Sequence, residues 1–332
     1  MKKLTINQEL KKKLTIASIT LAIILLIIGI AFYIGNIEFR TFVDRHILRK
    51  EIIQNNVANI DISSLENPSI NAYYKYITIL NKNILTTYSS SGKKEYEHEV
   101  KITNPLYSSN NRFLAIAEKK GQNLYLISES NLLWQKEIEG EIQKISVNRN
   151  GYVSVIITGG SYKAVVATYS QTGKELFKTY LSSTTAIDTA ISNDNKYLSI
   201  AEINTSGTLI QSNIKVISIE KAGIDPTNSV IYTHNAEANK LITDIKYQDK
   251  NNLLIFYDDG IHILYGENES ENISYTGKKV TFASIELNNY SVYTIEKTVG
   301  ILSTSTQVIM KNTRNAKRKL IYSTRYSKRF KK

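Results

Sequence analysis

The chain has 332 residues, enough for one large repeat array or for two ordinary domains. Cysteine is absent, which excludes disulfides, thiolate metal sites and thiol nucleophiles. The net charge of +12 lies at the two ends, because Lys311 to Lys332 carries ten Lys and Arg with no acid, and Met1 to Lys13 carries five Lys and one Glu. Removing these +10 and +4 leaves residues 14 to 310 at about −2, so no nucleic-acid partner is expected.

The first predicted element is an uncharged, mostly apolar run from Leu14 to Gly35. At about 1.5 Å per residue, a helix of this length covers roughly the 30 Å hydrocarbon thickness of a bilayer. The run therefore predicts one transmembrane helix that contacts the lipid bilayer as an uncleaved signal anchor. A cleaved signal peptide is the alternative, since Gly29-Ile30-Ala31 weakly matches a cleavage site.

The orientation of this helix follows from the basic residues on either side. Lys2, Lys3 and the triplet Lys11 to Lys13 precede the run, and the triplet adjoins it directly. Four basic residues follow the run at a greater distance: Arg40, Arg45, Arg49 and Lys50. Because basic residues concentrate on the cytoplasmic side, residues 1–13 are predicted to form a cytoplasmic tail and the C-terminal domain to lie outside the cell membrane. A cytoplasmic orientation of the domain is the alternative.

Residues 36–55 are predicted to form a helical stalk. Within Glu38 to Gln54, apolar side chains recur near helical spacing, with charges between them. The stalk is expected either to connect the anchor to the domain by packing on its first repeat, or to form an interfacial or dimerising helix.

The region from 56 to 323 is predicted to be a repeat of small antiparallel sheets. Gly151 to Phe177 contains three short strand-like runs with alternating apolar residues, broken at Gly159-Gly160 and at Gln171-Thr172-Gly173. Similar elements return about every 40 residues, which is the period of a four-stranded β-propeller blade. The expected fold is therefore an all-β propeller behind one transmembrane helix.

Two registers support the repeat. The segment Thr87 to Tyr96 matches Thr168 to Phe177, and Leu126 to Trp134 is a degenerate copy with Asn131 in the place of Gly92 and Gly173. Gly and Asn both tolerate positive φ, so these positions are expected to share a turn geometry. In the second register, Asn-rich turns precede inner strands that open on an aromatic residue, namely Phe113, Tyr152 and Tyr197.

About six repeat units are visible. The first, from Asn56 to Thr103, is expected to be incomplete, and the others begin near Asn104, Ile142, Thr185, Ile242 and Phe282. Six units could close a ring by themselves, and an incomplete ring of seven or eight blades is the other interpretation. Residues 324–332 lack a blade pattern and are expected to form a basic C-terminal tail.

A resemblance adds to this interpretation. The Lys-rich start, the single anchor, the FVDRHILRKEI stalk from Phe42 to Ile52 and the Asn/Gly-turn repeats resemble an uncharacterised family of clostridial single-pass membrane proteins with a WD40-like or PQQ-like propeller domain. The family implies a structural repeat and supplies no catalytic residues.

No catalytic, cofactor-binding or metal-binding residue is predicted. His98 is expected in a core or interface, His234 in an Asn-rich loop, and His262 opposite Tyr257 across a two-residue Asp259-Gly260 turn. Asp194 is expected to form a turn. Ser90 with Lys93 and Ser218 with Lys221 match Ser-x-x-Lys by chance, and a quinone cofactor is not expected because Trp134 is the single Trp.

The strongest electrostatic feature is the C-terminal basic run. Its expected contacts with polyanions, either anionic lipid or wall polymers, are made by Lys317, Arg318, Lys319, Arg325, Lys328 and Arg329. A solvated tail without a partner is the alternative.

The sequence therefore predicts a membrane-anchored, extracytoplasmic propeller that acts as a non-catalytic interaction scaffold or sensor, with an unknown protein or cell-wall partner. The alternative is an envelope enzyme that acts on carbohydrate or peptide through loop carboxylates. A cluster of acids in the central channel would favour the enzyme, whereas a neutral channel lined by Tyr and Asn would favour the scaffold.

Overall fold

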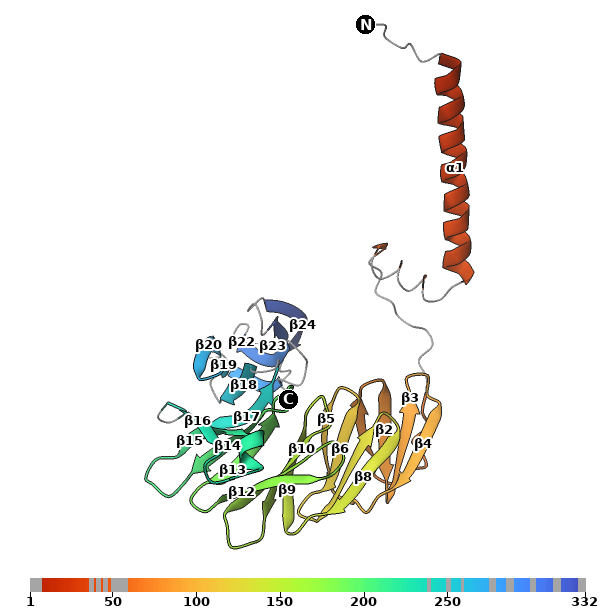
Figure 1. Ribbon diagram of the computed structural model, residues 1–332. Helices are drawn as coiled ribbons and strands as arrows, with labels where there is room; N and C mark the ends of the chain where they lie inside the picture. Colours follow the sequence, from red (N-terminus) through yellow and green to blue (C-terminus); the bar gives the residue numbers. More distant parts are fainter. Residues whose placement is uncertain are drawn as a thin grey trace, which may run out of the picture. The chain divides into compact units, whose positions relative to one another are not determined.

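The computed structural model describes residues 8–35, 39, 43, 47–48, 59–237, 240–248, 252–257, 260–274, 279–284, 290–298, 303–312 and 318–327 (Figure 1). The chain divides into two compact units, Met1–Asn59 and Ile60–Lys332. Most of the predicted stalk, including His46, lies outside the described residues.

The first unit contains the helix α1 (Gln8–Gly35). Its stretch Thr15–Gly35 has a mean hydropathy of 2.7, so by length and composition it can cross a membrane. A signal sequence near the N-terminus can have the same length and composition. Leu25 and Leu26 are 61% and 63% exposed, which fits a helix whose side chains face lipid. The helix begins before the apolar run, so Lys11 to Lys13 lie on its first turns and not in a separate tail.

The second unit contains six four-stranded antiparallel sheets among the described residues, numbered here in chain order. Sheet 1 contains β1 (Ser69–Tyr73), β2 (Tyr76–Asn81), β3 (Ile84–Ser89) and β4 (Lys94–Glu99). Sheet 2 contains β5 (Pro105–Asn110), β6 (Phe113–Glu118), β7 (Asn123–Ser128) and β8 (Asn131–Glu137). Sheet 3 contains β9 (Glu141–Val147), β10 (Val153–Thr158), β11 (Ala164–Tyr169) and β12 (Glu175–Leu181).

The later sheets continue the same order, and α3 is a single turn between two strands. Sheet 4 contains β13 (Thr185–Ile191), β14 (Tyr197–Asn204), β15 (Gln211–Ser218) and β16 (Val230–Asn235), and α3 (Ile219–Ala222) lies between β15 and β16 in the chain. Sheet 5 contains β17 (Ile242–Tyr247), β18 (Asn252–Tyr257), β19 (Gly260–Tyr265) and β20 (Asn268–Ser274). Sheet 6 contains β21 (Lys279–Ser284), β22 (Tyr290–Thr298), β23 (Ser303–Asn312) and β24 (Arg318–Ser327).

The predicted unit boundaries agree with these sheets. Units expected near Asn104, Ile142, Thr185, Ile242 and Phe282 begin with β5, β9, β13, β17 and β21. The first unit was expected to be incomplete, and this is wrong, because sheet 1 has all four strands. The last strand, β24, continues to Ser327, beyond the predicted end of the propeller at 323, and residues 328–332 lie outside the described residues.

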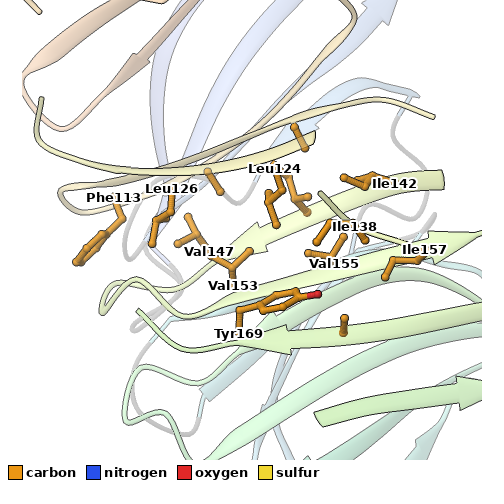
Figure 2. Close-up of a cluster of buried hydrophobic side chains, with 14 residues drawn as sticks. Phe113, Leu124, Leu126, Ile138, Ile142, Val147, Val153, Val155, Ile157 and Tyr169 are labelled. Carbon is orange, nitrogen blue, oxygen red and sulfur yellow. The ribbon is translucent and has the colours of Figure 1, made fainter. Parts of the chain in front are cut away.

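The hydrophobic core is divided into clusters that each lie between two neighbouring sheets. One cluster joins Leu124 and Leu126 of sheet 2 to Val147, Val153 and Val155 of sheet 3 (Figure 2). Corresponding clusters join sheets 1 and 2, sheets 3 and 4, sheets 4 and 5, and sheets 5 and 6. Each sheet from the second to the fifth is therefore packed on both faces.

This double burial explains the composition of the second strands. In β6, Phe113 and Ala115 face sheet 3, while Leu114 and Ile116 face sheet 1. β10 is likewise buried from Val153 to Ile157, although Ser154 interrupts its apolar residues, so its burial lacks the alternation expected for Gly151 to Phe177. An alternating strand has one face in water, whereas here both faces are covered.

The outermost strands carry a second repeated feature. Each fourth strand has a register shift near its start, and the residue after it occupies one equivalent position in all six sheets. In five sheets that residue is aromatic: Tyr96, Trp134, Phe177, Tyr232 and Tyr322. The pairing confirms the sequence alignment of Tyr96, Trp134 and Phe177.

Trp134 shows what this position does. Its indole N–H donates to the carbonyl of Gln171 in sheet 3 at 3.0 Å, and its ring lies 6.2 Å from the Tyr169 ring. Two residues further along the outer strand, His98 Nε2 is 2.8 Å from the Ser130 carbonyl oxygen of the next sheet. These two contacts join sheet 1 to sheet 2 and sheet 2 to sheet 3, and His98 is an interface residue, as predicted.

The turns confirm most of the expected backbone geometry. Gly92 and Gly173 have φ of 78° and 80°, and the Asn-rich turns place Asn111 and Asn195 at 52° and 61°. The Asn-rich turns at Asn111 and Asn195 lie before β6 and β14, the second strands of their sheets, whereas the sequence predicted such turns before inner strands. Asn131 was expected to share the positive φ, and this is wrong: it pairs with Ser128 as the first residue of β8, and Glu129 takes the positive φ of 55°.

Gly173 is the turn glycine that the packing constrains most directly. A Cβ at this position would lie 3.0 Å from Trp134 Cγ, and a φ of 80° is unfavourable for a side chain. We therefore expect Gly173→Ala to lower the free energy of unfolding by about 1–2 kcal/mol. Thermal or denaturant unfolding of the full chain in detergent measures the change.

Gly160→Ala is the matched control, because nothing lies within 4 Å of its Cβ position. It should change the free energy of unfolding by less than about 0.5 kcal/mol. Equal effects of the two substitutions would contradict the Trp134 contact.

Candidate functional site

The innermost strands of five successive sheets line one cavity of about 820 Å³. These strands are β1, β5, β9, β13 and β17, and each contacts the next. The uncharged polar lining residues are Asn71, Asn110, Asn111, Asn148, Ser108, Ser109, Ser146, Thr189, Tyr73, Tyr74, Tyr107 and Tyr247. The charged lining residues are Lys144, Lys246, Asp188 and Asp244. We call this cavity the central channel.

Hydrogen bonds between sheets show that the inner strands run in the same direction. The backbone N–H of Val147 donates to Ser108 Oγ at 3.0 Å, and Asn148 Nδ2 donates to the Ser192 carbonyl at 2.9 Å. The donors and acceptors lie at matching positions near the ends of their strands. The turns that follow these strands therefore gather at one end of the channel, which we call the turn end.

A repeated β-bulge sets which side chains enter the channel. In β9, β13 and β17 the pairing with the second strand skips Gln143, Ile187 and Thr243, each the third residue of its strand or one position from it. The next residues are Lys144, Asp188 and Asp244, so three charged side chains occupy equivalent positions. Because a bulge reorients the side chains around it, the fold brings these three residues to one level of the channel.

Lys144 is the centre of this charge cluster. Its Nζ lies 2.8 Å from Asp188 Oδ1 and 3.5 Å from Asp244 Oδ1. The backbone N–H of Ile245 donates to Asp188 Oδ2 at 2.7 Å and contacts Asp244 Oδ1 at 3.1 Å. The side chain of Asp188 is 3% exposed, whereas those of Lys144 and Asp244 are 38% and 44% exposed. One buried carboxyl therefore anchors an exposed ion pair.

The environment shifts the pKa values of the Asp188 and Asp244 carboxyl groups in opposite directions. Burial raises the pKa of Asp188 well above its ordinary value, and the adjacent Asp244 raises it further, against the opposing charge of Lys144. Burial also acts to raise the pKa of Asp244, but the hydrogen bond from Asp188 and the charge of Lys144 outweigh it and lower this pKa. Burial would lower the pKa of Lys144, and the two carboxyl groups raise it instead.

The cluster therefore holds Asp244 as a carboxylate, Lys144 as an ammonium and Asp188 as the group that is costly to ionise. Its charges compensate one another within the channel, and its contacts join sheets 3, 4 and 5. Removing one partner would leave a buried charge without compensation.

Tyr74 lies at the turn end of the channel. It follows β1, has a φ of 50° and keeps 57% of its surface exposed. The Lys75 ammonium lies 5.6 Å from the centre of its ring. Tyr107 and Tyr247 are held by hydrogen bonds to Ser69 and Ser199, at 3.1 Å and 2.8 Å. Tyr74 is thus an exposed ring at the mouth of a channel whose other tyrosines are anchored.

Another buried carboxyl lies outside this lining. Glu202 is fully buried in β14, where Lys215 Nζ is 3.0 Å from its Oε2 and the Thr184 hydroxyl donates to the same oxygen at 2.8 Å. These contacts stay within sheet 4 and the loop before it, so Glu202 stabilises the sheet.

Three of the predicted polyanion-contact residues lie on the last described strand. Arg318, Lys319 and Arg325 lie on β24, where they pair with Lys311, Met310 and Ser305 of β23. Lys317, Lys328 and Arg329 lie outside the described residues. Their contact with polyanions stays a prediction.

The other histidines serve packing. His234 lies on β16, and not in a loop as expected, with its Nε2 3.0 Å from the Tyr257 hydroxyl. The rings of His262 and Tyr257 pack at 4.4 Å, as expected, but the predicted register is wrong. Tyr257 pairs with Gly260 and His262 with Ile255, because Gly260 is the first residue of β19.

The remaining motifs are turns and caps. Ser218 is the N-cap of α3 and accepts a hydrogen bond from the Lys221 backbone N–H at 3.3 Å, which explains one Ser-x-x-Lys match. Asp194 accepts from the Ser192 hydroxyl at 2.7 Å and from the Lys196 backbone N–H at 3.2 Å. Asp194 therefore stabilises its own turn, as predicted.

Lys144, Asp188 and Asp244 were not among the functional residues predicted from the sequence. The signal was present as one pattern at the start of three successive units, in which an apolar residue is followed two positions later by a charge and then by Ile or Thr: Ile142-x-Lys144-Ile145, Ala186-x-Asp188-Thr189 and Ile242-x-Asp244-Ile245.

The raised pKa of Asp188 predicts a pH dependence of stability. Because its native pKa exceeds the unfolded value of about 3.9, the contribution of Asp188 is complete below that value and is lost as pH rises through the native pKa. Asp188→Asn removes the cost of ionisation. The melting temperature of this variant, minus that of the unsubstituted chain, should therefore increase from about pH 5 to about pH 8.

Asp244→Asn provides the opposite case. Its native pKa is lowered, so its contribution is present above the unfolded value and lost as pH falls. The corresponding difference in melting temperature should become more negative toward high pH. Parallel pH curves for both variants and the unsubstituted chain would exclude the assigned protonation states.

Comparison with solved structures shows the fold. The Cps50 (Swd1) β-propeller domain of Myceliophteria thermophila is similar with a TM-score of 0.50 and 9% identity, covering 76% of this chain and 85% of that one. The hydrazine synthase of Kuenenia stuttgartiensis gives a TM-score of 0.49 and 11% identity, covering 74% and 77%. At such identities, the first likeness shows a β-propeller and nothing about activity.

Comparison with protein sequences assigns the chain to one family. No curated protein matches the chain. A family model described as "Family of unknown function (DUF5711)" matches residues 49–330, which covers the end of the predicted stalk and the six sheets. The chain therefore belongs to the DUF5711 family.

Proposed function

We propose that the protein is a membrane-anchored, extracytoplasmic β-propeller that binds a ligand or partner at its central channel and acts as a non-catalytic scaffold or sensor of the cell envelope. The apolar stretch Thr15–Gly35 supports the anchor, since it is long enough to span a bilayer. The basic residues Lys11 to Lys13 beside it support a cytoplasmic N-terminus.

One observation carries the proposal: three of the four charged residues that line the channel, Lys144, Asp188 and Asp244, are paired with one another. Lys144 pairs with both Asp188 and Asp244, so an adjacent ammonium group balances the negative charge of an ionised carboxyl in this cluster. The rest of the polar lining is Tyr, Asn, Ser and Thr, apart from Lys246. Such a surface can bind by hydrogen bonding without acid–base chemistry.

A second candidate function has a specific observation in its favour. Asp188 and Asp244 are two neighbouring carboxyl groups whose pKa values are moved in opposite directions, a pattern found in acid–base pairs of hydrolases. The proposed alternative is thus an envelope enzyme that hydrolyses carbohydrate or peptide. Its carboxyl groups would lie on inner strands, and not on the blade loops.

Topology mapping tests the orientation. A phosphatase that is active only outside the cytoplasm, fused after Lys332, should be active in intact cells. Fusion at this point keeps β24 (Arg318–Ser327) whole. Replacing Lys11, Lys12 and Lys13 by Gln should reduce that activity, because it removes the basic residues that hold the N-terminus inside. Activity of only a cytoplasmic reporter at the same position would refute the proposed orientation.

Photocrosslinking in intact cells tests the channel as the binding site. A benzophenone amino acid at position 74 should form an adduct with the ligand, since Tyr74 is exposed at the channel mouth. The same group at position 162 is the control, because Tyr162 is 43% exposed and does not line the channel. Equal labelling at both positions, or none at 74, would count against channel binding.

The same experiment separates scaffold from enzyme. If the protein only binds, Asp188→Asn should leave the adduct at position 74 unchanged or weaker. If it turns substrate over, this substitution should increase the adduct, since bound substrate would accumulate. An increase would favour the hydrolase.

A further inference from the structure

We infer that the central channel is a binding site for neutral, polyhydroxylated ligands, of the class of neutral oligosaccharides. This inference rests on the proposed function and specifies its ligand. The cavity of about 820 Å³ lies within the range of roughly 300–1,000 Å³ that small-molecule sites occupy.

Charge excludes ionic ligands first. The four charged residues in the lining, Lys144, Lys246, Asp188 and Asp244, give a net charge of zero when all are ionised and of +1 when Asp188, whose pKa is raised, is protonated. A ligand cation or anion would have to displace Lys144 from contacts of 2.8 Å and 3.5 Å with its two carboxyl partners. Removing one member of such a cluster leaves the others uncompensated, which is costly at a buried carboxyl such as Asp188. The channel therefore disfavours ligands with a formal charge.

The polar residues of the lining disfavour a wholly apolar ligand. The apolar residues that also line the cavity can face the apolar parts of a ligand: Ala72, Ile145, Val147, Ala190, Ile191 and Ile245. An apolar group placed against Asn, Ser and Tyr side chains would separate their polar atoms from water without replacing the lost hydrogen bonds. A hydroxyl group both donates and accepts, so it can bond to Asp244 as a donor and to Lys144 as an acceptor while the ion pair stays intact. These two side chains are 44% and 38% exposed, so a ligand in the channel reaches them.

Tyr74 completes the site with an apolar face. Its ring is 57% exposed at the turn end of the channel, although it belongs to a tight turn with a φ of 50°. A residue other than Gly, Asn or Asp is uncommon in this conformation, so the turn keeps a large ring where a smaller residue would be easier to accommodate. An aromatic face beside hydrogen-bonding groups suits a sugar ring, which has apolar C–H faces and polar edges.

Saturation-transfer NMR on the full chain in sugar-free nanodiscs tests the ligand class with disaccharides of matched size. The neutral probe N,N′-diacetylchitobiose should receive saturation from the protein. The cationic probe chitobiose and the anionic probe digalacturonate should receive little, since each would disturb the charge cluster. Transfer to a charged probe that equals or exceeds transfer to the neutral one would overturn the inference.

Two variants assign the binding to the channel. Tyr74→Asn keeps a residue that tolerates positive φ and should weaken binding of the neutral probe by about five-fold, through loss of the stacked ring. Tyr162→Asn removes another exposed ring, which is 43% exposed and lies outside the channel lining, and should leave binding unchanged. Melting temperatures of both variants check that the fold is retained. Equal affinities of the two variants would place the sugar elsewhere and overturn the inference.

Asp244→Asn provides a test of selectivity that does not depend on Tyr74. It makes the charge of the lining more positive by one unit, so binding should shift from the neutral probe toward digalacturonate. An unchanged preference would contradict the role of the charge cluster. If no saccharide binds but the crosslink at position 74 persists, the ligand class is wrong and the proposed channel function stands. If both are absent, both fail.

Discussion

The structure depends on one constraint: a four-stranded sheet whose two faces are both apolar cannot bury them by itself. Each such sheet needs a neighbour on either side, and the clusters between consecutive sheets provide it. Burying one Leu, Ile or Val side chain contributes about 1.5–3 kcal/mol, so even a few residues per interface outweigh the single hydrogen bonds between sheets. Those hydrogen bonds, such as the one from Trp134 to Gln171, set the register of neighbouring sheets.

The channel is a consequence of that packing. When neighbouring sheets pack against each other, their first strands lie side by side and the side chains on the inner edge line the channel. The bulges before Lys144, Asp188 and Asp244 place charge at this position in three successive sheets. A single charge there would be costly, whereas a lysine between two carboxyl groups is tolerated and ties three sheets together. The polar surface that results is the part of the fold most able to recognise a ligand.

The fold could be predicted further than the site. The Asn-rich turns before Phe113 and Tyr197 and the turn glycines Gly92 and Gly173 recur because the backbone needs positive φ there, and such requirements are visible in sequence. The completeness of sheet 1 was not visible, because its first strand, β1, is only five residues long and its largest aliphatic side chain, Ile70, is 53% exposed. The displacement of positive φ from Asn131 to Glu129 depends on the length of one turn, which pairing between strands decides.

The contacts in the channel could not be predicted from the sequence. A repeated pattern places Lys144, Asp188 and Asp244 at equivalent strand positions, but these residues lie 44 and 56 residues apart and meet only when the sheets stack. The most direct test of the central claim, a charge-compensated channel, is a carbon-13 NMR titration of the carboxyl groups of Asp188 and Asp244 in the full chain. The Asp188 carboxyl should titrate well above the ordinary value of about 3.9 and the Asp244 carboxyl below it. Titration of both groups together near the ordinary value would contradict the cluster and the channel chemistry built on it.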